Sequence, residues 1–483
     1  MKKLYSISIL LLVTIIATAQ QAGLKQYSLQ DAIAYAMQNN HDVKNSLLDQ
    51  EVAKARNHEI ITTGLPQVSA SVDYNYYFKK PIVPALSQFF LDTTSASARV
   101  LSYQASTDTT IRNILYQSAI DSKDQKISFV LANSLGASLQ LTQLIFDARY
   151  IFGIKATKDL LKTSRLTKQL SDNEVKYNVT KAYYQARSAQ EANALLKNTL
   201  TLVQKLLDDT RKTFEQGLIE ELDVDRLSLI EANLQTQINT QNQMAEVALA
   251  NLKFQMGLSL KDEIMLTNTL DELKTLANVA DEGTFDAKQR VEYELLNTAI
   301  RLKGFDMQAK RSSYYPSLVG FLNYGWSAQS DKFGDMFKTS TQYYPDGDSR
   351  KISPWFSQGL VGISLKLPIF DSGQKMAQVK QAKLDQQKTM NDLENFQNAA
   401  ELQYQVATSS LRSAIADQGN AKRAVDLSEK IFKTNQIKYQ QGVGSSFELV
   451  QSEQDFIANQ LKYVQSSMAL LNAKADLDKA LGK

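Results

Sequence analysis

The sequence predicts an α+β fold built as a tandem repeat, in which two β-strands and a long helical hairpin occur twice. Three observations predict it. The seven prolines all lie outside two long stretches, residues 148–257 and 374–483. Four short segments outside those stretches alternate apolar and polar residues. Matching residues also recur in the two halves of the chain, which indicates an internal repeat.

Residues 1–20 have the pattern of a cleavable secretory signal. A positive start, Met1-Lys2-Lys3, precedes an apolar run over 4–17 and the small residues Ala17 and Ala19. A membrane-anchoring helix, the alternative, needs roughly 18–20 apolar residues, and this run is shorter. We therefore expect an exported mature chain, and no later apolar run in the sequence approaches spanning length.

The two proline-free stretches predict long helices, because a proline inside a helix costs about 3 kcal/mol. Gly217 and Gly442 each lie about two-thirds of the way along their stretch. Each stretch then divides into a helix of roughly 65 residues, a break, and a returning helix of roughly 35. At 1.5 Å per residue the longer helix reaches about 100 Å.

A stripe of small and apolar residues runs along the second long helix in steps of three and four. Such a stripe is typical of a coiled-coil seam or of a helical-bundle core, and periodicity does not separate the two. Its many alanines favour a thin-walled assembly. Its members are Ala400, Tyr404, Ala407, Leu411, Ala414, Ala421 and Val425.

The alternating segments are residues 68–76, 138–142, 318–326 and 361–369. One apolar and one polar face is typical of transmembrane strands, although a soluble sandwich gives the same alternation. The secretory signal and the lack of a second apolar face favour the membrane. Membrane barrels begin at about eight strands, and open edges are not tolerated in lipid. Four strands therefore predict that several chains share one barrel.

The repeat sets the organisation of the chain. Pro66-Gln67-Val68 matches Pro316-Ser317-Leu318, and residues 141–147 match 365–371. We expect a signal peptide over 1–20, a first repeat over 21–257, a linker over 258–286 and a second repeat over 287–483. The segments 81–134 and 328–359 are expected to be loops that join the strands of each pair.

Composition disfavours nucleic-acid binding and catalysis. Lys plus Arg number 54 against 51 Asp plus Glu, so the net charge is only +3 and no basic stripe is indicated. There is no cysteine, and the two histidines, His41 and His58, are expected on the surface of the first helix. We expect no catalytic residues, no metal site and no cofactor.

Several motifs together resemble the TolC-like outer-membrane efflux family (outer membrane factors) over essentially the whole mature chain. They are the opening Ser28-Leu29-Gln30-Asp31-Ala32-Ile33 with Ala36 and Asn39-Asn40, the paired strand ends 144–147 and 368–373, and the paired Phe214-Glu215-Gln216-Gly217 and Tyr439-Gln440-Gln441-Gly442. The resemblance implies a homotrimer with a shared 12-stranded β-barrel in the outer membrane of a Gram-negative bacterium, continued by an α-helical periplasmic tunnel. It also implies a passive conduit that works with a periplasmic adaptor and an inner-membrane transporter. Residues 258–286 would then form an equatorial segment.

The resemblance also implies two sets of site residues. The helical tips that contact the adaptor would be Gln216, Gly217 and Leu218 in the first repeat and Gln441, Gly442 and Val443 in the second. The pore constriction would lie at Glu448 and Gln451, with a contribution from Asp223. Here a neutral amide replaces the second acid of the family, and Gly444 replaces an arginine that can hold the tip shut. Glu453, further along the same helix, is expected to affect the pore less.

Two other classes of protein were weighed. A periplasmic adaptor also carries a long helical hairpin, but it has one hairpin inserted in β-domains, whereas this sequence predicts two hairpins and two strand pairs. A secreted hydrolase would show a Gly-x-Ser-x-Gly, His-Glu-x-x-His or P-loop motif, and none occurs.

Overall fold

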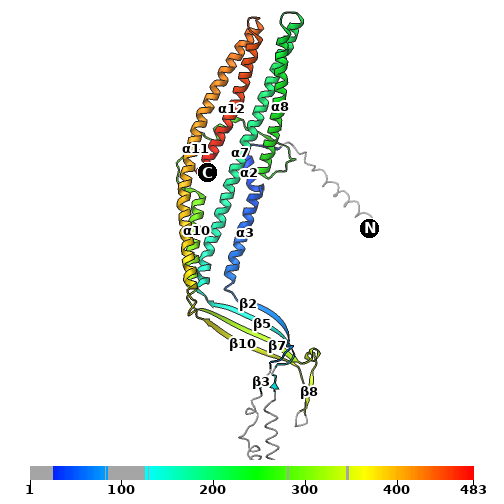
Figure 1. Cartoon of the computed structure of the whole chain (residues 1–483), viewed down its shortest axis with the longest axis vertical. Coiled ribbons are helices and arrows are strands. Elements are labelled where there is room, and N and C mark those ends of the chain that lie inside the picture. Colours follow the sequence, from blue (N-terminus) through cyan, green and yellow to red (C-terminus); the bar gives the residue numbers. More distant parts are fainter. Residues whose placement is uncertain (1–24, 82, 85–125, 129, 280–281, 344–347) are drawn as a thin grey trace, which may run out of the picture. The chain divides into compact units, whose positions relative to one another are not determined.

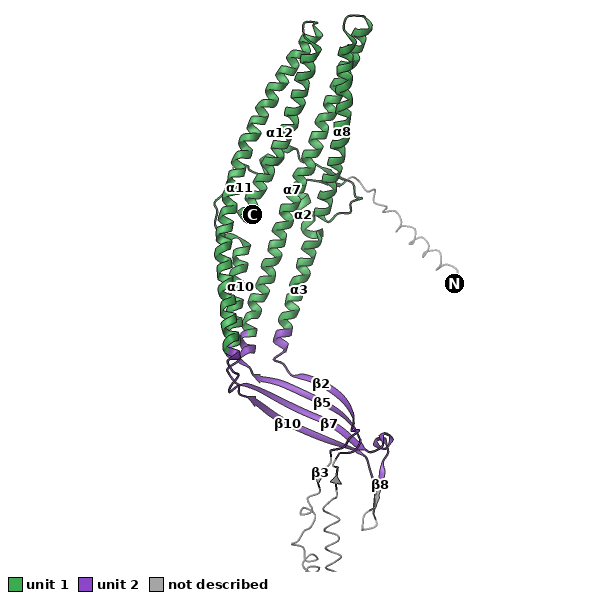
Figure 2. Cartoon of the chain, in the orientation of Figure 1, with its two compact units in different colours: residues 1–58, 153–310, 376–483 green, residues 59–152, 311–375 purple. Residues whose placement is uncertain are grey.

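The structure is a computed structural model that describes residues 25–81, 83–84, 126–128, 130–279, 282–343 and 348–483. The predicted signal peptide and most of the predicted loop 81–134 lie outside the described residues. The chain divides into two compact units (Figure 2). One comprises residues 59–152 and 311–375 and contains the main sheet, and the other comprises residues 1–58, 153–310 and 376–483 and is largely helical. Each unit draws on both sequence repeats.

The main sheet has four antiparallel strands in the order β10-β7-β5-β2 (Figure 1). They are β2 (Gln67–Tyr76), β5 (Asn133–Phe146), β7 (Ser317–Ser330) and β10 (Trp355–Lys366). The predicted alternating segments all lie in these strands, except that β10 ends at Lys366 and leaves out Leu367 and Ile369. Pro368 explains the early end, because proline has no N–H to donate to a neighbouring strand.

The register aligns the apolar residues of all four strands. Val68 lies opposite Leu141, Leu141 opposite Leu322, and Leu322 opposite Val361. This apolar row is uncovered: the exposed fraction is 69% for Val68 and 76% for Val361. On the other face, Ser69, Gln140 and Asn323 form a polar row in the next register position, and Leu360 of β10 lies opposite Asn323. At this register position β2, β5 and β7 therefore have the polar face that the alternation predicts, whereas β10 places an apolar residue there.

The repeated Phe-Asp pair marks the start of each long helix. Asp147 Oδ1 accepts a hydrogen bond from Arg149 N (2.8 Å), and Asp371 Oδ2 accepts one from Lys375 N (3.2 Å). These carboxylates satisfy backbone N–H groups that the first helical turn leaves without a partner. The match between residues 141–147 and 365–371 is thus explained by the same capping arrangement at the start of both long helices.

The segments predicted as loops contain more structure than expected. Residues 328–359 include the ends of β7 and β10, the 3-10 helix η2 (Phe333–Phe337), and a hairpin of β8 (Ser340–Tyr343) and β9 (Ser349–Ile352). In the segment 81–134, β3 (Val83–Pro84) pairs with β4 (Lys126–Ile127).

The helical unit contains the two predicted hairpins. The first is α7 (Ala148–Glu215) with α8 (Glu221–Met256), and the second is α11 (Gln374–Gln440) with α12 (Ser446–Ala480). The lengths of 68, 36, 67 and 35 residues confirm the predicted division at the two glycines. The alanine stripe on α11 is also confirmed as a packing face, since Ala400, Leu411 and Ala414 are buried. Among the described residues, no helix combines the length and apolarity needed to cross a membrane.

The predicted first helix is in fact two helices, α2 (Leu29–Asn39) and α3 (His41–Thr62). Asn40 separates them: its Nδ2 donates to Gln255 O (2.7 Å) and its Oδ1 accepts from Asp42 N (2.7 Å). The sequence pattern does not reveal this break, because the partner of Asn40 lies 215 residues away. His41 and His58 are both exposed on α3, as expected.

The described residues of the segment 258–286 belong to the helical unit. It contains β6 (Ile264–Leu266) and α9 (Leu270–Leu276), and η1 (Ala287–Gln289) and α10 (Val291–Ser312) follow. Strand β6 pairs in parallel with β1 (Lys25–Tyr27) near the start of the described chain. Ser28 then caps α2: its Oγ accepts from Asp31 N (3.2 Å), and Asp31 Oδ2 accepts from Ser28 N (3.1 Å). The Ser28–Ile33 motif thus records a capping box.

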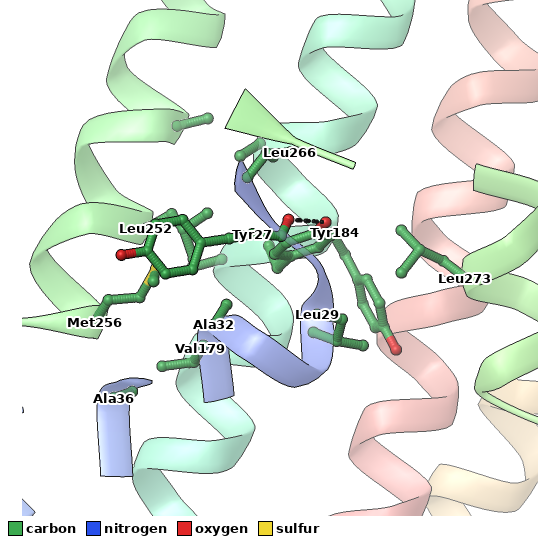
Figure 3. Close-up of a cluster of buried hydrophobic side chains, with 14 of the residues drawn as sticks. Tyr27, Leu29, Ala32, Ala36, Val179, Tyr184, Leu252, Met256, Leu266 and Leu273 are labelled. Carbon is green, nitrogen blue, oxygen red and sulfur yellow. Dashed lines mark hydrogen bonds between the residues drawn. The ribbon is translucent and has the colours of Figure 1, made fainter. Parts of the chain in front are cut away.

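Around this strand pair lies a buried apolar cluster, here called the central cluster (Figure 3). The hydroxyl of Tyr183 on α7 donates to Tyr27 O (3.0 Å), which ties α7 to the strand pair. Ala32 and Ala36 are fully buried, and their small side chains allow α2 to lie close to its neighbours. The central cluster includes Tyr27, Leu29, Ala32, Ala36, Val179, Tyr183, Tyr184, Leu252, Met256, Leu266 and Leu273.

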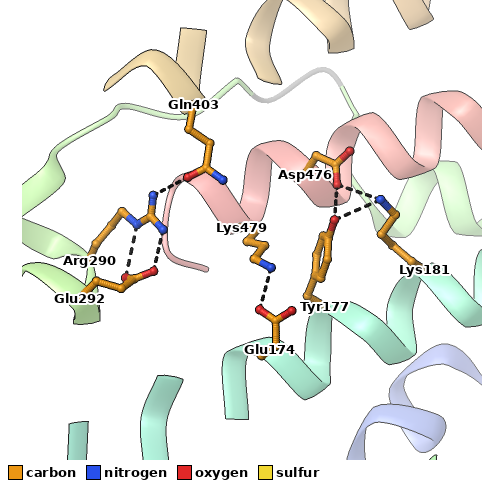
Figure 4. A network of polar contacts seen from close by, with 8 residues as sticks. All are labelled: Glu174, Tyr177, Lys181, Arg290, Glu292, Gln403, Asp476 and Lys479. Carbon is orange, nitrogen blue, oxygen red and sulfur yellow. Dashed lines mark hydrogen bonds and ion pairs between the residues drawn. The ribbon is translucent and has the colours of Figure 1, made fainter. Parts of the chain in front are cut away.

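Polar contacts tie the two hairpins together beside the central cluster (Figure 4). Tyr177 on α7 donates to Asp476 on α12 (2.6 Å), and Lys181 donates to the same carboxylate (3.1 Å). Burial and the bond to Asp476 raise the pKa of Tyr177. Lys479 on α12 pairs with Glu174 on α7 (2.6 Å). The first helix of one hairpin is therefore bound to the last helix of the other.

Candidate functional site

Each hairpin ends in a turn that requires glycine. Gly217 has φ +72° and Gly442 has φ +73°, in the left-handed region that disfavours other residues. Gly217 N donates to Phe214 O (2.7 Å), and Gly442 N donates to Tyr439 O (3.0 Å), so both turns close the preceding helix in the same way. No neighbouring atom lies within 4 Å of a Cβ built at either position. The requirement for glycine is therefore conformational rather than steric.

Gly444 has a different role in the second turn. Its N–H donates to Lys438 O (3.1 Å), and a Cβ there would lie 2.9 Å from Lys438 Cβ and Tyr439 N. A side chain at this position would require the turn to shift. The turn itself therefore accounts for a glycine where the resembled family can have an arginine.

Apolar side chains at the two tips are exposed. The exposed fraction is 70% for Leu218 and 76% for Val443, the residues that follow the two glycines. Leu222 and Phe447, in the first turns of α8 and α12, are also exposed. Gln216 and Gln441 lie beside them in the turns, and both are exposed.

Hydrogen bonds join the two tips. Ser446 Oγ on α12 donates to Asp223 Oδ1 on α8, and Arg226 Nη1 donates to Ser446 Oγ (3.0 Å). The guanidinium of Arg226 lies 5.9 Å from the centre of the Phe447 ring. A groove of about 820 Å³ runs between the tips and is lined by residues of both turns. One side-chain network therefore couples the ends of the two hairpins.

The three predicted constriction residues have different surroundings. Glu448 and Gln451 lie one helical turn apart on the exposed face of α12, and Gln451 Nε2 donates to Asp455 Oδ1 (3.1 Å). Asp223 is half-buried and bound to Ser446 and Arg226. The structure thus brings Asp223 together with Ser446 of the other hairpin and leaves Glu448 exposed.

Along the helices next to the two turns, the hairpins enclose a second apolar cluster, here called the tip cluster. It contains side chains from α7, α8, α11 and α12, which explains why the two hairpins stay together near their ends. Phe432 of α11 stacks on Phe456 of α12, with ring centres 5.8 Å apart. The buried members are Leu196, Val203, Leu206, Leu207, Leu227, Ile230, Leu234, Ile238, Phe432, Leu449 and Ile457.

Glu453 is buried in this apolar region of α12, whereas Glu448 is exposed. Only 1% of Glu453 is exposed, and burial raises its pKa to about 7. The burial of Glu453 could have been predicted from the sequence, because Glu453 lies four residues after Leu449 and four before Ile457. Arg226 and Ser446 carried no such signal, since their contact joins residues 220 positions apart.

The fold is that of outer-membrane channels of known structure. The CmeC channel of Campylobacter jejuni superposes with a TM-score of 0.65 at 16% identity, covering 94% of this chain and 85% of that one. The open MtrE channel of Neisseria gonorrhoeae gives 0.64 at 15% identity, covering 94% and 88%. These likenesses establish the fold.

Sequence comparison extends this to the class of protein. A family model described as "Outer membrane efflux protein" matches residues 297–483. The outer membrane protein TolC of Salmonella enteritidis is 21% identical over 432 residues, which cover 88% of this chain and 75% of TolC. TolC of Escherichia coli is 22% identical over 376 residues, covering 73% of each protein. Together these findings indicate a TolC-like outer membrane efflux protein with a Gram-negative outer-membrane location, and they support a channel rather than an adaptor.

Proposed function

We propose that this chain is the outer-membrane channel of a tripartite efflux or secretion system, a passive conduit from the periplasm to the exterior. The observation that carries the proposal is the open four-stranded sheet, whose apolar row from Val68 to Val361 is uncovered. Lipid is a suitable environment for that face. The chain is proposed to have no enzymatic activity and no cofactor, in keeping with relatives that are channel proteins.

The sheet edges support a homotrimer. Within the described residues, β2 and β10 each pair with one strand only, so each edge presents backbone N–H and C=O groups without strand partners. Such edges are unstable in lipid, and joining β2 of one chain to β10 of the next removes them. Three chains then give a closed sheet of 12 strands, and their paired hairpins would form an α-helical periplasmic tunnel.

The absence of native cysteine makes this arrangement testable by disulfide trapping. Single cysteines placed along β2 and β10 should give covalent trimers in the membrane. The control pair is Ser71→Cys with Ser138→Cys, since these hydroxyls lie 3.0 Å apart within one chain and their disulfide adds no subunit. A protein that stays monomeric with both strands intact would refute the shared sheet.

We place the adaptor contact at the two tips. The exposed Leu218 and Val443 provide apolar contacts, and the groove between the tips gives space for a partner helix. Replacing both Gly217 and Gly442 by bulky residues should abolish export and leave the trimer in the membrane. Gly419 is the control: it lies within α11 with no atom within 4 Å of a Cβ, so added bulk there should leave export intact. Normal export by the double variant would reject the assignment.

We place the pore constriction at Glu448 and Gln451. Three-fold symmetry would bring three Glu448 carboxylates towards one axis, where like charges attract cations. Asp223, engaged with Ser446 and Arg226, would act by holding the tips together. In planar bilayers, Glu448→Gln should weaken cation selectivity and block by divalent cations. Asp426→Asn, an exposed acid on α11, is the control, and equal small effects would place the constriction elsewhere.

A further inference from the structure

Glu453 is a carboxylic acid placed among apolar side chains. It lies on α12, with the buried Leu449 and Ile457 one turn away on either side. Its exposed fraction of 1% makes it one of the most fully buried large side chains of the described chain. No described residue donates a hydrogen bond to Glu453 Oε2. A group in this position is tolerated when it is protonated and costly when it is ionised.

The charged residues near Glu453 lie on the outer faces of the surrounding helices. On α8, Glu231 accepts a hydrogen bond from the exposed Gln204 of α7, whereas its neighbour Ile230 is buried. On α7, Lys205 is exposed beside the buried Leu206. Lys205 and Glu231 therefore lie outside the buried part of the tip cluster.

The same holds for α11 and α12. Glu429 and Lys433 pair on the outside of α11 (2.6 Å), on either side of the buried Phe432. Asp455 is exposed on α12 and accepts from Gln451. Arg226, at the tip, is bound to Ser446. Within the described residues, burial alone accounts for the raised pKa of Glu453, which is about 7.

The place of Glu453 in the fold gives its ionisation a consequence. The tip cluster joins α7 and α8 of the first hairpin to α11 and α12 of the second. An ionised carboxylate there needs water or a donor, and water reaches it only if the hairpin ends move apart. We propose that ionisation of Glu453 loosens the packing between the two hairpin ends, so that the closed end of the channel opens more readily as the pH rises. The loosened packing concerns the chain itself, whereas the easier opening of the channel rests on the proposed function.

Hydrogen exchange detected by mass spectrometry tests the first half on the full-length trimer. Peptides covering 446–457 and 221–234 are followed at about pH 6 and about pH 8, with rates corrected for intrinsic exchange. Since the pKa moves from 4.5 in water to about 7 in the packed state, opening should increase on the order of tenfold between these pH values. Glu453→Gln should remove this pH dependence. Glu448→Gln, an exposed acid on the same helix, should keep it.

A dependence that persists in Glu453→Gln, or wild-type protection that is equal at both pH values, would overturn the proposal. Should the amide variant fail to assemble, Glu453→Met provides the same test with an apolar side chain of similar length.

Single-channel recording tests the second half. Open probability should rise with pH in the wild type and stay constant in Glu453→Gln. If wild-type channels conduct but their open probability does not change with pH, the link between tip packing and opening is overturned. A trimer that shows the exchange result but never conducts would overturn the proposed function and leave the packing inference standing.

Discussion

The central cluster and the tip cluster bury similar apolar side chains but treat their polar groups differently. In the central cluster the buried hydroxyl of Tyr183 is bonded to Tyr27 O, and Leu29 N donates to Asn268 Oδ1 (2.8 Å). In the tip cluster Glu453 Oε2 has no donor among the described residues. Directional bonds fix the region around β1 and β6, whereas the tips are held by apolar packing and a few side-chain bonds. The helical unit thus combines a fixed region, the central cluster, with a region whose packing can change, the tip cluster.

The largest expected effect comes from the fixed region. Leu252→Ala removes a fully buried side chain of the central cluster and should lower the free energy of unfolding by about 3 kcal/mol, because it leaves a cavity. Chemical denaturation of the extracted protein measures this. Leu229→Ala, an exposed position on the same helix, should change it by no more than about 0.5 kcal/mol. Equal losses in the two variants would contradict the comparison.

The tip cluster should differ in its response to pH. Because the pKa of Glu453 is raised from 4.5 to about 7, the protonated acid stabilises the fold fully below about pH 4.5, and this contribution is lost as the pH rises through 7. Above pH 7, Glu453→Gln should therefore be more stable than the wild type by about 3 kcal/mol. Below about pH 4.5 the gain should vanish. Denaturation curves at both pH values check this, and a gain independent of pH would argue against a buried ionisable group.

The bonded hydroxyl of the central cluster should have a smaller effect. Tyr183→Phe removes one of the two donors to Tyr27 O, the other being Thr267 N, and also removes the acceptor of Asn268 N, so it should cost about 1–2 kcal/mol. Hydrogen exchange should show the loss first in β1 and β6. Tyr315→Phe, at an exposed tyrosine, is the matched control and should be neutral. Unchanged protection of β1 in Tyr183→Phe would show that packing alone holds this strand.

The smallest effect is expected at the start of α2. Ser28→Ala removes the capping box and should cost about 1 kcal/mol, whereas Ser28→Thr should retain most of it. The pKa of Asp31, lowered by its bonds to Ser28, should return towards its ordinary value in the alanine variant. Thermal unfolding and an NMR titration of Asp31 measure the two changes. Equal stability of Ala and Thr at this position would show that the cap contributes nothing.

The long helices and the strands could be predicted from the sequence because their signals are local. Proline exclusion, glycine at the turns and period-two alternation each act within a few residues. The hairpin lengths and the apolar face of the sheet follow from them. The early end of β10 also has a local signal, Pro368, but the match with residues 141–147 predicts a strand that continues past it.

What the sequence did not reveal depends on distant contacts. Asn40 ends α2 through a bond to Gln255, and β1 is a strand only because β6 lies beside it. At the candidate site, the glycine turns were predicted, whereas the pairing of Arg226 and Asp223 with Ser446 required the second hairpin to be in place. Glu453 differs from these cases, because its spacing of four residues from Leu449 and from Ile457 is a local signal of burial, although a charged residue is usually exposed.

The parallel pairing of β1 with β6 also constrains the order of folding. Leu29 and Asn268, which the pairing brings together, are 239 residues apart, so this contact closes one of the longest loops in the chain. Contacts of high sequence separation form late, because the intervening chain must first lose much of its freedom. During synthesis, which begins at the N-terminus, Leu29 and Ala32 have no strand pair to pack against until residues 264–266 have been made. The first helix of the described chain, α2, is therefore among the last to reach its native surroundings.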